Sequence, residues 1–176
     1  MEVIFISKER VRNPLIDDIR EIGRIIKERG LVEGSFGNIS VRYGNRIIIT
    51  SSGSDLGNLG DDDFVEVADY NPITNIALAI GTKKPSIETP MHWLIYGKPN
   101  INAVIHTHKI FTGIPTTENY APAGSLDLAK EVLKALRKSD VINILNHGSV
   151  AVGINLRDAF SKLVGRENPN GSNKRE

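Results

Sequence analysis

The sequence predicts an α/β fold in which helices cover the faces of one sheet that is mainly antiparallel. Apolar residues recur at helical spacing in several segments, and most segments between them have the pattern of strand pairs joined by tight turns. The chain contains no internal repeat, coiled coil or low-complexity linker. We therefore expect one domain over residues 1–176.

The first half of the chain predicts one helix followed by two strand pairs. Residues 14–30 carry apolar side chains at helical spacing, with a proline at the start and a glycine at the end. Strands are expected near residues 39–42 and over residues 46–50, on either side of a Gly-Asn turn. A second strand pair is expected within residues 63–79, turning at an Asn-Pro pair.

The middle of the chain returns to helix and then to strand. A helix is expected over residues 85–98, with Ser86 as its N-cap and a proline in its tolerated first turn. The apolar run in "NAVIH", residues 102–106, predicts a strand.

The last third predicts two further helices around a strand pair. The helices are expected over residues 125–139 and 155–165, each with a serine or asparagine cap at its first position. The strand pair is expected over residues 141–153, turning near the sequence Asn-His-Gly. The polar segment 166–176 is expected to fray.

Composition excludes several classes of site. Lysine plus arginine (22) nearly balances aspartate plus glutamate (21), so no overall field favours nucleic acid or an anionic membrane. The absence of cysteine excludes disulfides, thiolate metal sites and a cysteine nucleophile. No apolar run approaches the roughly 20 residues of a membrane span, and the N-terminus lacks the features of a signal peptide. We expect a cytoplasmic protein.

Two histidines on one predicted strand indicate a metal site. Because side chains alternate along a strand, His106 and His108 should project from the same face while Thr107 faces away. His147, in the Asn-His-Gly turn, is a good third ligand. Three nitrogens with one open position are typical of catalytic zinc, although another divalent ion is possible. The alternative is that these are separately hydrogen-bonded core histidines.

Glu88 is four residues before His92 on the predicted helix, so the two share one helix face. A glutamate in a first turn has a simpler explanation, namely favourable electrostatics at the helix start. If that end of the helix faces the metal, however, the carboxylate could move a proton beside an activated substrate oxygen.

Three loops rich in glycine and hydroxyl residues could hold a phosphate: residues 34–40, 50–54 and 84–88. Backbone N–H groups at such turns bind anions without lysine or arginine, which would suit a nearly neutral chain. Each loop alone could equally be an ordinary turn. Neither a G-x-G-x-x-G motif nor a Walker loop is present, so no dinucleotide or nucleoside triphosphate site is expected.

The order of these motifs resembles the class II aldolase/adducin family. The resemblance rests on "GSFGNISVR", "ITSSGSDL", "KPSIETPMHWLIY", "NAVIHTHK", "YAPAGSLDLA" and "ILNHGSVAVGINLRDAF", and extends over about residues 15–163. It implies a three-layer α/β/α fold and a homotetramer with active sites between subunits. It also implies roles for single residues: zinc ligands His106, His108 and His147, acid/base Glu88, and substrate phosphate ligands Gly37, Asn38, Ser52, Gly53 and Ser86.

The function that this resemblance implies is that of a zinc-dependent aldehyde-lyase. It would cleave a sugar phosphate such as fuculose 1-phosphate to dihydroxyacetone phosphate and an aldehyde, through an enediolate stabilised by the zinc ion. Sugar-phosphate dehydratases and epimerases of the same family are alternatives, although an epimerase should have aspartate in place of Glu88. A non-catalytic assembly module that retains the metal, or a zinc-dependent hydrolase, are alternatives of other classes.

The sequence departs from the family pattern at three places. Ile87 stands where many relatives have a second serine before the glutamate, which removes one hydroxyl from the phosphate site. The interval between "HTHK" and "YAPAGS" is shorter than usual, in a region from which relatives often draw a substrate-facing tyrosine. The C-terminal helix also gives way early to a polar tail, whereas other members use C-terminal residues to close the site.

Overall fold

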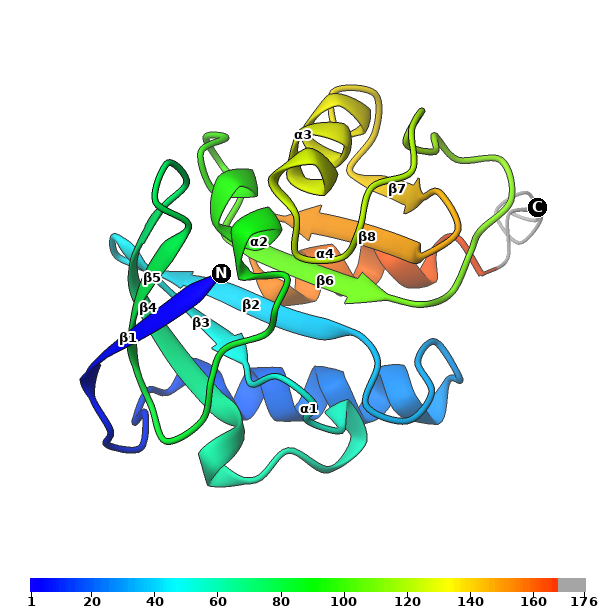
Figure 1. Ribbon diagram of the computed structural model, residues 1–176. Helices are drawn as coiled ribbons and strands as arrows, with labels where there is room; N and C mark the ends of the chain where they lie inside the picture. Colours follow the sequence, from blue (N-terminus) through cyan, green and yellow to red (C-terminus); the bar gives the residue numbers. More distant parts are fainter. Residues whose placement is uncertain (168–176) are drawn as a thin grey trace.

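A computed structural model describes residues 1–167 of the chain (Figure 1). Its strands are β1 (Glu2–Ser7), β2 (Asn38–Tyr43), β3 (Arg46–Thr50), β4 (Phe64–Asn71), β5 (Ile76–Ile80), β6 (Ala103–Thr107), β7 (Val141–Ile144) and β8 (Gly148–Gly153). Within the described residues they form an eight-stranded sheet of order β1-β5-β4-β3-β2-β6-β8-β7. Only β1 and β5 pair in parallel there, so the prediction of a mainly antiparallel sheet is confirmed.

Helices cover both faces of this sheet. They are α1 (Leu15–Glu28), α2 (Thr89–Ile95), α3 (Leu126–Ala135) and α4 (Leu156–Val164). One apolar core packs α1 and α4 against one face, and a second packs α2 and α3 against the other (Figure 1). The expected three-layer α/β/α architecture is therefore confirmed.

Local sequence signals explain most of these boundaries. The side chains of Ser125 and Asn155 accept hydrogen bonds from backbone N–H groups in the first turns of α3 and α4, as expected of N-caps. In α1 the fully buried Ile19 and Ile26 lie on the face that packs on the sheet. Burying such a side chain contributes about 1.5–3 kcal/mol, which outweighs the propensity differences along the helix.

The N-cap expected for α2 is wrong by two residues, because Ser86 does not cap this helix. The N-cap position belongs to Glu88. The N–H of Ser86 donates to the carbonyl of Thr50, and Pro85 bridges to Ser51, so residues 85–86 are held against the end of β3 and cannot enter the helix. The Ser86 hydroxyl instead accepts from the N–H of Glu88 in the turn before the helix.

Strand β1 was not expected. Its sequence "EVIFIS" is apolar on both faces, so it lacks the alternation that marks a half-buried strand. Val3 and Phe5 pack against the core while Ile4 and Ile6 stay exposed. Its stability comes from backbone pairing with the distant strand β5, for which the local sequence gives no signal.

Two expectations about the chain as a whole are not tested by this structure. Most of the polar tail expected at residues 166–176 lies outside the described residues, which end at residue 167. The assignment of residues 1–176 to one domain stays a prediction. Among the helices within residues 1–167, none has the length and apolar character that crossing a bilayer requires.

The neighbouring strands β2 and β6 carry polar side chains on the face that meets α2. Ile39 of β2 and Ile105 of β6 pack into the α1/α4 core, whereas Val104 packs into the α2/α3 core. Because side chains alternate, Asn38 and His106 share the α2 face, and these two residues are register partners in the sheet. Buried polar groups are thus concentrated at one end of the α2 layer, and the candidate site lies there.

Candidate active site

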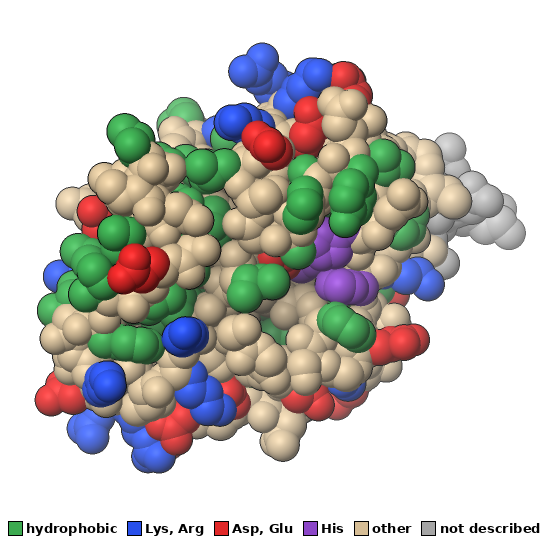
Figure 2. Space-filling view, in the orientation of Figure 1, with side chains coloured by type: hydrophobic (Ala, Val, Ile, Leu, Met, Phe, Trp, Pro, Cys, Tyr) green, Lys and Arg blue, Asp and Glu red, His purple; other side chains and the backbone are tan. Residues whose placement is uncertain are grey.

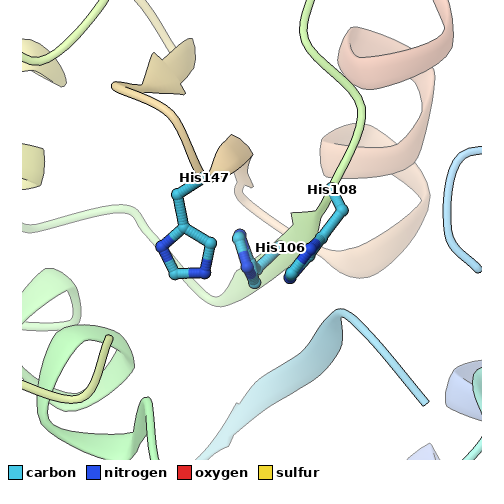
Figure 3. Close-up of side chains that lie close together, drawn as sticks. All are labelled: His106, His108 and His147. Carbon is cyan, nitrogen blue, oxygen red and sulfur yellow. The ribbon is translucent and has the colours of Figure 1, made fainter. Parts of the chain in front are cut away.

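Three histidines converge at the ends of the central strands (Figure 3). His106 is on β6, His108 follows the same strand, and His147 lies in the turn between β7 and β8. One ring nitrogen from each lies within 4.8 Å of the others, and within residues 1–167 no other group of three or more such side chains could hold a metal ion. His106 is fully buried, and the other two are half-buried. The predicted grouping of these histidines is therefore present.

The hydrogen bonding of His106 fits a metal ligand. Its Nδ1 lies 3.0 Å from the carbonyl oxygen of Ser149, so Nδ1 carries the proton and donates it. Nε2 is then left with a lone pair, and it makes no hydrogen bond within the described part of the chain. A buried polar atom without a partner is destabilising, whereas a cation at this point would satisfy it. In metal sites the histidine ligands commonly donate their other ring N–H to a carbonyl or carboxylate, which fixes the orientation of the ring.

His108 and His147 are held in the neutral form, which can bind a cation. Burial, together with the neighbouring imidazoles, lowers the pKa of His108 to about 4. Burial likewise lowers the pKa of His147, and His106 adds to the effect. Neutral imidazoles offer a lone pair, and three neutral nitrogens leave a fourth position open on a tetrahedral ion such as zinc.

Gly148 allows His147 to approach the other two ligands. Its φ is +152°, a backbone conformation that residues with a side chain rarely adopt. A Cβ at this position would lie 2.0 Å from the carbonyl oxygen of Thr107 and 2.8 Å from Cα of His108. Only glycine lets the start of β8 lie this close to the end of β6. This close backbone contact brings His147 next to His106 and His108.

We expect Gly148→Ala to destabilise the protein by more than about 1 kcal/mol, since it combines an unfavourable φ with a backbone clash. Urea unfolding of the metal-free protein measures this. Gly44→Ala is the matched control, because Gly44 has a positive φ of +57° but no neighbour within 4 Å of its Cβ position. Equal, small losses in both variants would contradict the role given to the close approach.

Glu88 points into the histidine cluster. Its Oε2 lies 3.2 Å from Nε2 of His106, and its Oε1 lies 3.5 Å from Nε2 of His147. Burial favours the neutral form of this carboxyl, but the imidazoles and the Asn38 hydrogen bond outweigh it, so the pKa of Glu88 is lowered. A carboxylate facing an imidazole lone pair needs a cation between or beside them, either a proton or a metal ion.

A cavity of about 240 Å³ opens beside these groups. Its lining includes Glu88, His108, His147 and the residues predicted to hold phosphate, which are Gly37, Asn38, Ser52, Gly53 and Ser86. Figure 2 shows histidine side chains reaching the surface there, with hydrophobic side chains on both sides. Three loops far apart in sequence therefore meet at one hollow, as the sequence predicted.

The loops offer fewer free backbone N–H groups than expected. The N–H of Ser52 donates to Lys84, and that of Ser86 donates to Thr50. These two residues can therefore bind an anion only through their hydroxyls. Within residues 1–167, the N–H groups of Gly53 and Ile87 make no backbone hydrogen bond and remain available.

Some residues of the cavity were not predicted individually. Phe36 stacks on the ring of His108, with centroids 4.8 Å apart. Ser35, Ser51, Ile87 and Ala123 complete the lining. Phe36 directly precedes Gly37 and Asn38, which were predicted to line the site. Its neighbours in sequence could therefore have indicated that it lies there too. A stacked aromatic fixes the ring of His108 and lies beside the three-histidine group.

The shortened segment after His108 does not reach the cavity. The side chain of Asn143 on β7 holds it at the sheet edge, donating to the carbonyl of Phe111 and accepting from its N–H. Thr116 forms a parallel bridge with Asn143. In the described part of the chain no tyrosine lines the cavity, and Tyr120 is 65% exposed. The segment covers the edge of β7 instead.

The chain is similar in sequence and fold to known proteins. The chain matches the family described as Class II Aldolase and Adducin N-terminal domain over residues 17–117 and 109–168. The two matched parts overlap at residues 109–117, in the segment after His108. L-fuculose phosphate aldolase of Methanocaldococcus jannaschii is 38% identical over 166 residues, covering 81% of this chain and 86% of that protein. Because 81% of 176 residues is fewer than 166, the alignment contains positions that this chain lacks.

Relatives of other reaction types also match. The 3-oxo-tetronate 4-phosphate decarboxylase of Haemophilus influenzae is 29% identical over 167 residues, covering 79% of this chain and 77% of that protein. Among solved structures, an L-fuculose 1-phosphate aldolase has a TM-score of 0.77 at 24% identity, covering 90% of this chain and 84% of that chain. This chain belongs to the class II aldolase and adducin family.

Proposed function

We propose that this protein is a zinc-dependent aldehyde-lyase that cleaves a sugar phosphate such as fuculose 1-phosphate into dihydroxyacetone phosphate and an aldehyde. One observation carries the proposal: the Glu88 carboxylate lies 3.2 and 3.5 Å from the free ring nitrogens of two histidines, beside the cavity that the serine and glycine loops line. The relative named L-fuculose phosphate aldolase supports the substrate class.

The proposed chemistry divides between the metal and Glu88. His106, His108 and His147 would hold the ion, which supplies Lewis-acid polarisation of substrate oxygens when bound. Breaking the carbon–carbon bond leaves its electron pair on the phosphate-bearing half, and one proton must be returned to that carbon. Glu88 is the buried acid/base group closest to the cluster, so we assign this proton to it. The hydroxyl group of the substrate that becomes the aldehyde releases one proton, so the number of protons released equals the number taken up.

The direct test combines metal analysis with a cleavage assay. The purified protein, loaded with zinc, is incubated with fuculose 1-phosphate and related ketose 1-phosphates, and dihydroxyacetone phosphate is measured by a coupled dehydrogenase. We expect release that depends on both the metal and the phosphate substrate. Zinc binding without any cleavage would overturn the lyase proposal and favour a dehydratase or an assembly module.

The phosphate site gives a separate prediction. Ser52→Ala should raise KM for the sugar phosphate about 10-fold, because a hydrogen bond to a charged group contributes about 1.5–3 kcal/mol. The value of kcat should change little, since this contact is made in the ground state and the transition state alike. Ser54→Ala is the control, because that hydroxyl donates to the carbonyl of Ser51 and does not line the cavity. A similar KM for both variants would contradict the site.

We also propose a cytoplasmic homo-oligomer, a tetramer, with the cavity at a subunit interface. Phe36 and Ile87 line the cavity yet are each 58% exposed, as expected of apolar side chains that a second subunit covers. Light scattering after size exclusion measures the subunit number. A monomer at assay concentration that retains full activity would contradict this proposal.

A further inference from the structure

A chain of buried hydrogen bonds leads away from Glu88 into the core. Asn38 Nδ2 lies 2.8 Å from Glu88 Oε2, and Asn38 Oδ1 lies 2.5 Å from His92 Nε2. The Ser40 hydroxyl lies 2.7 Å from His92 Nδ1 and 2.8 Å from the Tyr96 hydroxyl. All five side chains are at least nine-tenths buried, and none of His92, Ser40 and Tyr96 lines the cavity.

When Glu88 is a carboxylate, only one order of donors and acceptors is possible along this series of hydrogen bonds. A carboxylate only accepts, so the amide nitrogen of Asn38 must donate to it and the amide oxygen must face His92. That oxygen can only accept, so His92 must carry its proton on Nε2. Were the chain reversed, the Asn38 oxygen would face the carboxylate without a hydrogen between them.

The hydrogen bonds of Ser40 and Tyr96 support the same order of donors and acceptors. With its proton on Nε2, His92 offers a lone pair at Nδ1, to which the Ser40 hydroxyl donates. The Tyr96 hydroxyl then donates to Ser40. Burial lowers the pKa of His92 to about 3 and raises that of Tyr96, so the imidazole stays neutral and the phenol keeps its proton. The guanidinium of Arg42 lies over the Tyr96 ring and donates to the Tyr96 carbonyl, which holds that end in place.

From this chain we infer that His92 is a positioning residue: with its proton on Nε2, it holds the Asn38 amide in the one orientation that donates to Glu88. Ser40 and Tyr96 stabilise that tautomer, because their hydroxyls supply a donor to Nδ1 of His92. This inference rests on the proposed role of Glu88 in moving a proton. Asn38 also lines the cavity, so the tautomer of His92 sets the orientation of an amide that borders both Glu88 and the ligand space.

The function of His92 differs from that of the other three histidines. It lies on α2, one turn from Glu88, and it is not among the group whose nitrogens converge on the candidate metal centre. A buried histidine in an apolar layer could simply satisfy its own hydrogen bonds. The inferred role predicts more than stability, because the identity of the nitrogen that donates to Asn38 should matter.

Two substitutions of similar size separate these possibilities. In His92→Gln the amide nitrogen reaches about as far as Nε2 and can still donate to Asn38, while the contact with Ser40 is lost. In His92→Asn the shorter side chain can still meet Ser40 but leaves the Asn38 oxygen without its donor. We expect kcat of the zinc-loaded enzyme to fall about 10–100-fold in His92→Asn, as for other second-shell partners. His92→Gln should retain kcat within about 5-fold.

The value of KM should stay within about 2-fold in His92→Gln, in which Asn38 keeps its hydrogen-bond donor. In His92→Asn a rise in KM can accompany the loss of kcat, because Asn38 lines the cavity. Zinc content and thermal midpoints are measured alongside. Equal loss of kcat in the glutamine and asparagine variants would overturn the positioning role and leave a structural one. If His92→Asn does not fold, Tyr96→Phe replaces it, since it removes only the last donor of the hydrogen-bond series. Its kcat should fall more than that of His92→Gln, and an equal kcat in these two variants would overturn the positioning role.

A second readout needs no turnover. In zinc-loaded protein labelled with ¹⁵N-histidine, long-range proton–nitrogen spectra report which ring nitrogen carries the proton, and the His92 signals are those missing in His92→Gln. We expect a neutral ring protonated at Nε2. Protonation at Nδ1 would overturn the inference. An enzyme that cleaves no sugar phosphate but shows the Nε2 tautomer would instead overturn the proposed function alone.

Discussion

Glu88→Gln is expected to lower kcat by about 10²–10⁴-fold, the contribution of a positioned general acid/base. Glutamine has nearly the same shape and can still accept the hydrogen bond from Asn38. What it loses is the ability to take up and release a proton. The buried carboxylate between His106 and His147 has no nearby substitute, because the cavity lining in residues 1–167 contains no other acidic side chain.

Metal content distinguishes this role from that of a ligand. Zinc affinity of the Glu88→Gln variant should stay within about 10-fold of wild type, since three histidines remain. KM for the sugar phosphate should also change little. Stopped assays and a chelator titration on the same preparation give all three values. A variant that keeps its kcat within a few-fold would show that another group moves the proton, and a variant that loses its zinc would make Glu88 a ligand.

The fold could be predicted because its signals are local. Helix caps such as Ser125 and Asn155, the Gly-Asn hairpin turn and the alternation in β2 each depend on neighbours in sequence. Strand β1 could not, because an edge strand with apolar side chains on both faces depends on pairing with residues some 74 positions away, Glu2 with Ile76. The start of α2 failed for the same reason, since a bond between Ser86 and Thr50 decides it.

The candidate site was predictable as far as its motifs reach. His106 and His108 share a face because a strand has a period of two, and His147 was found through its Asn-His-Gly turn. The network behind Glu88 was not predictable, because Ser40 and Tyr96 are ordinary strand and helix-end residues in the sequence. Only the pairing of β2 with β6 and the packing of α2 on them places Asn38 between Glu88 and His92.

The second large effect concerns the metal centre itself. His106→Asn should lower zinc affinity by more than about 100-fold, because even the loss of a second-shell partner costs about 10–100-fold. Asparagine is the informative replacement: its amide nitrogen can still donate to the Ser149 carbonyl, as Nδ1 does, but it has no counterpart of the Nε2 lone pair. His108→Asn and His147→Asn should behave alike, and cleavage activity should fall with zinc content in all three.

The fourth histidine provides the matched control. His92 is as fully buried as His106, so His92→Gln perturbs the core at a comparable depth, yet it should keep wild-type zinc affinity. Thermal melts with and without a chelator give a readout independent of catalysis. A ligand that binds only the folded state at 100 times its Kd stabilises by about 2.7 kcal/mol, so chelation should lower the melting temperature of wild type and His92→Gln but not of His106→Asn. Equal sensitivity to the chelator in all four histidine variants would mean that the three converging nitrogens do not hold the ion.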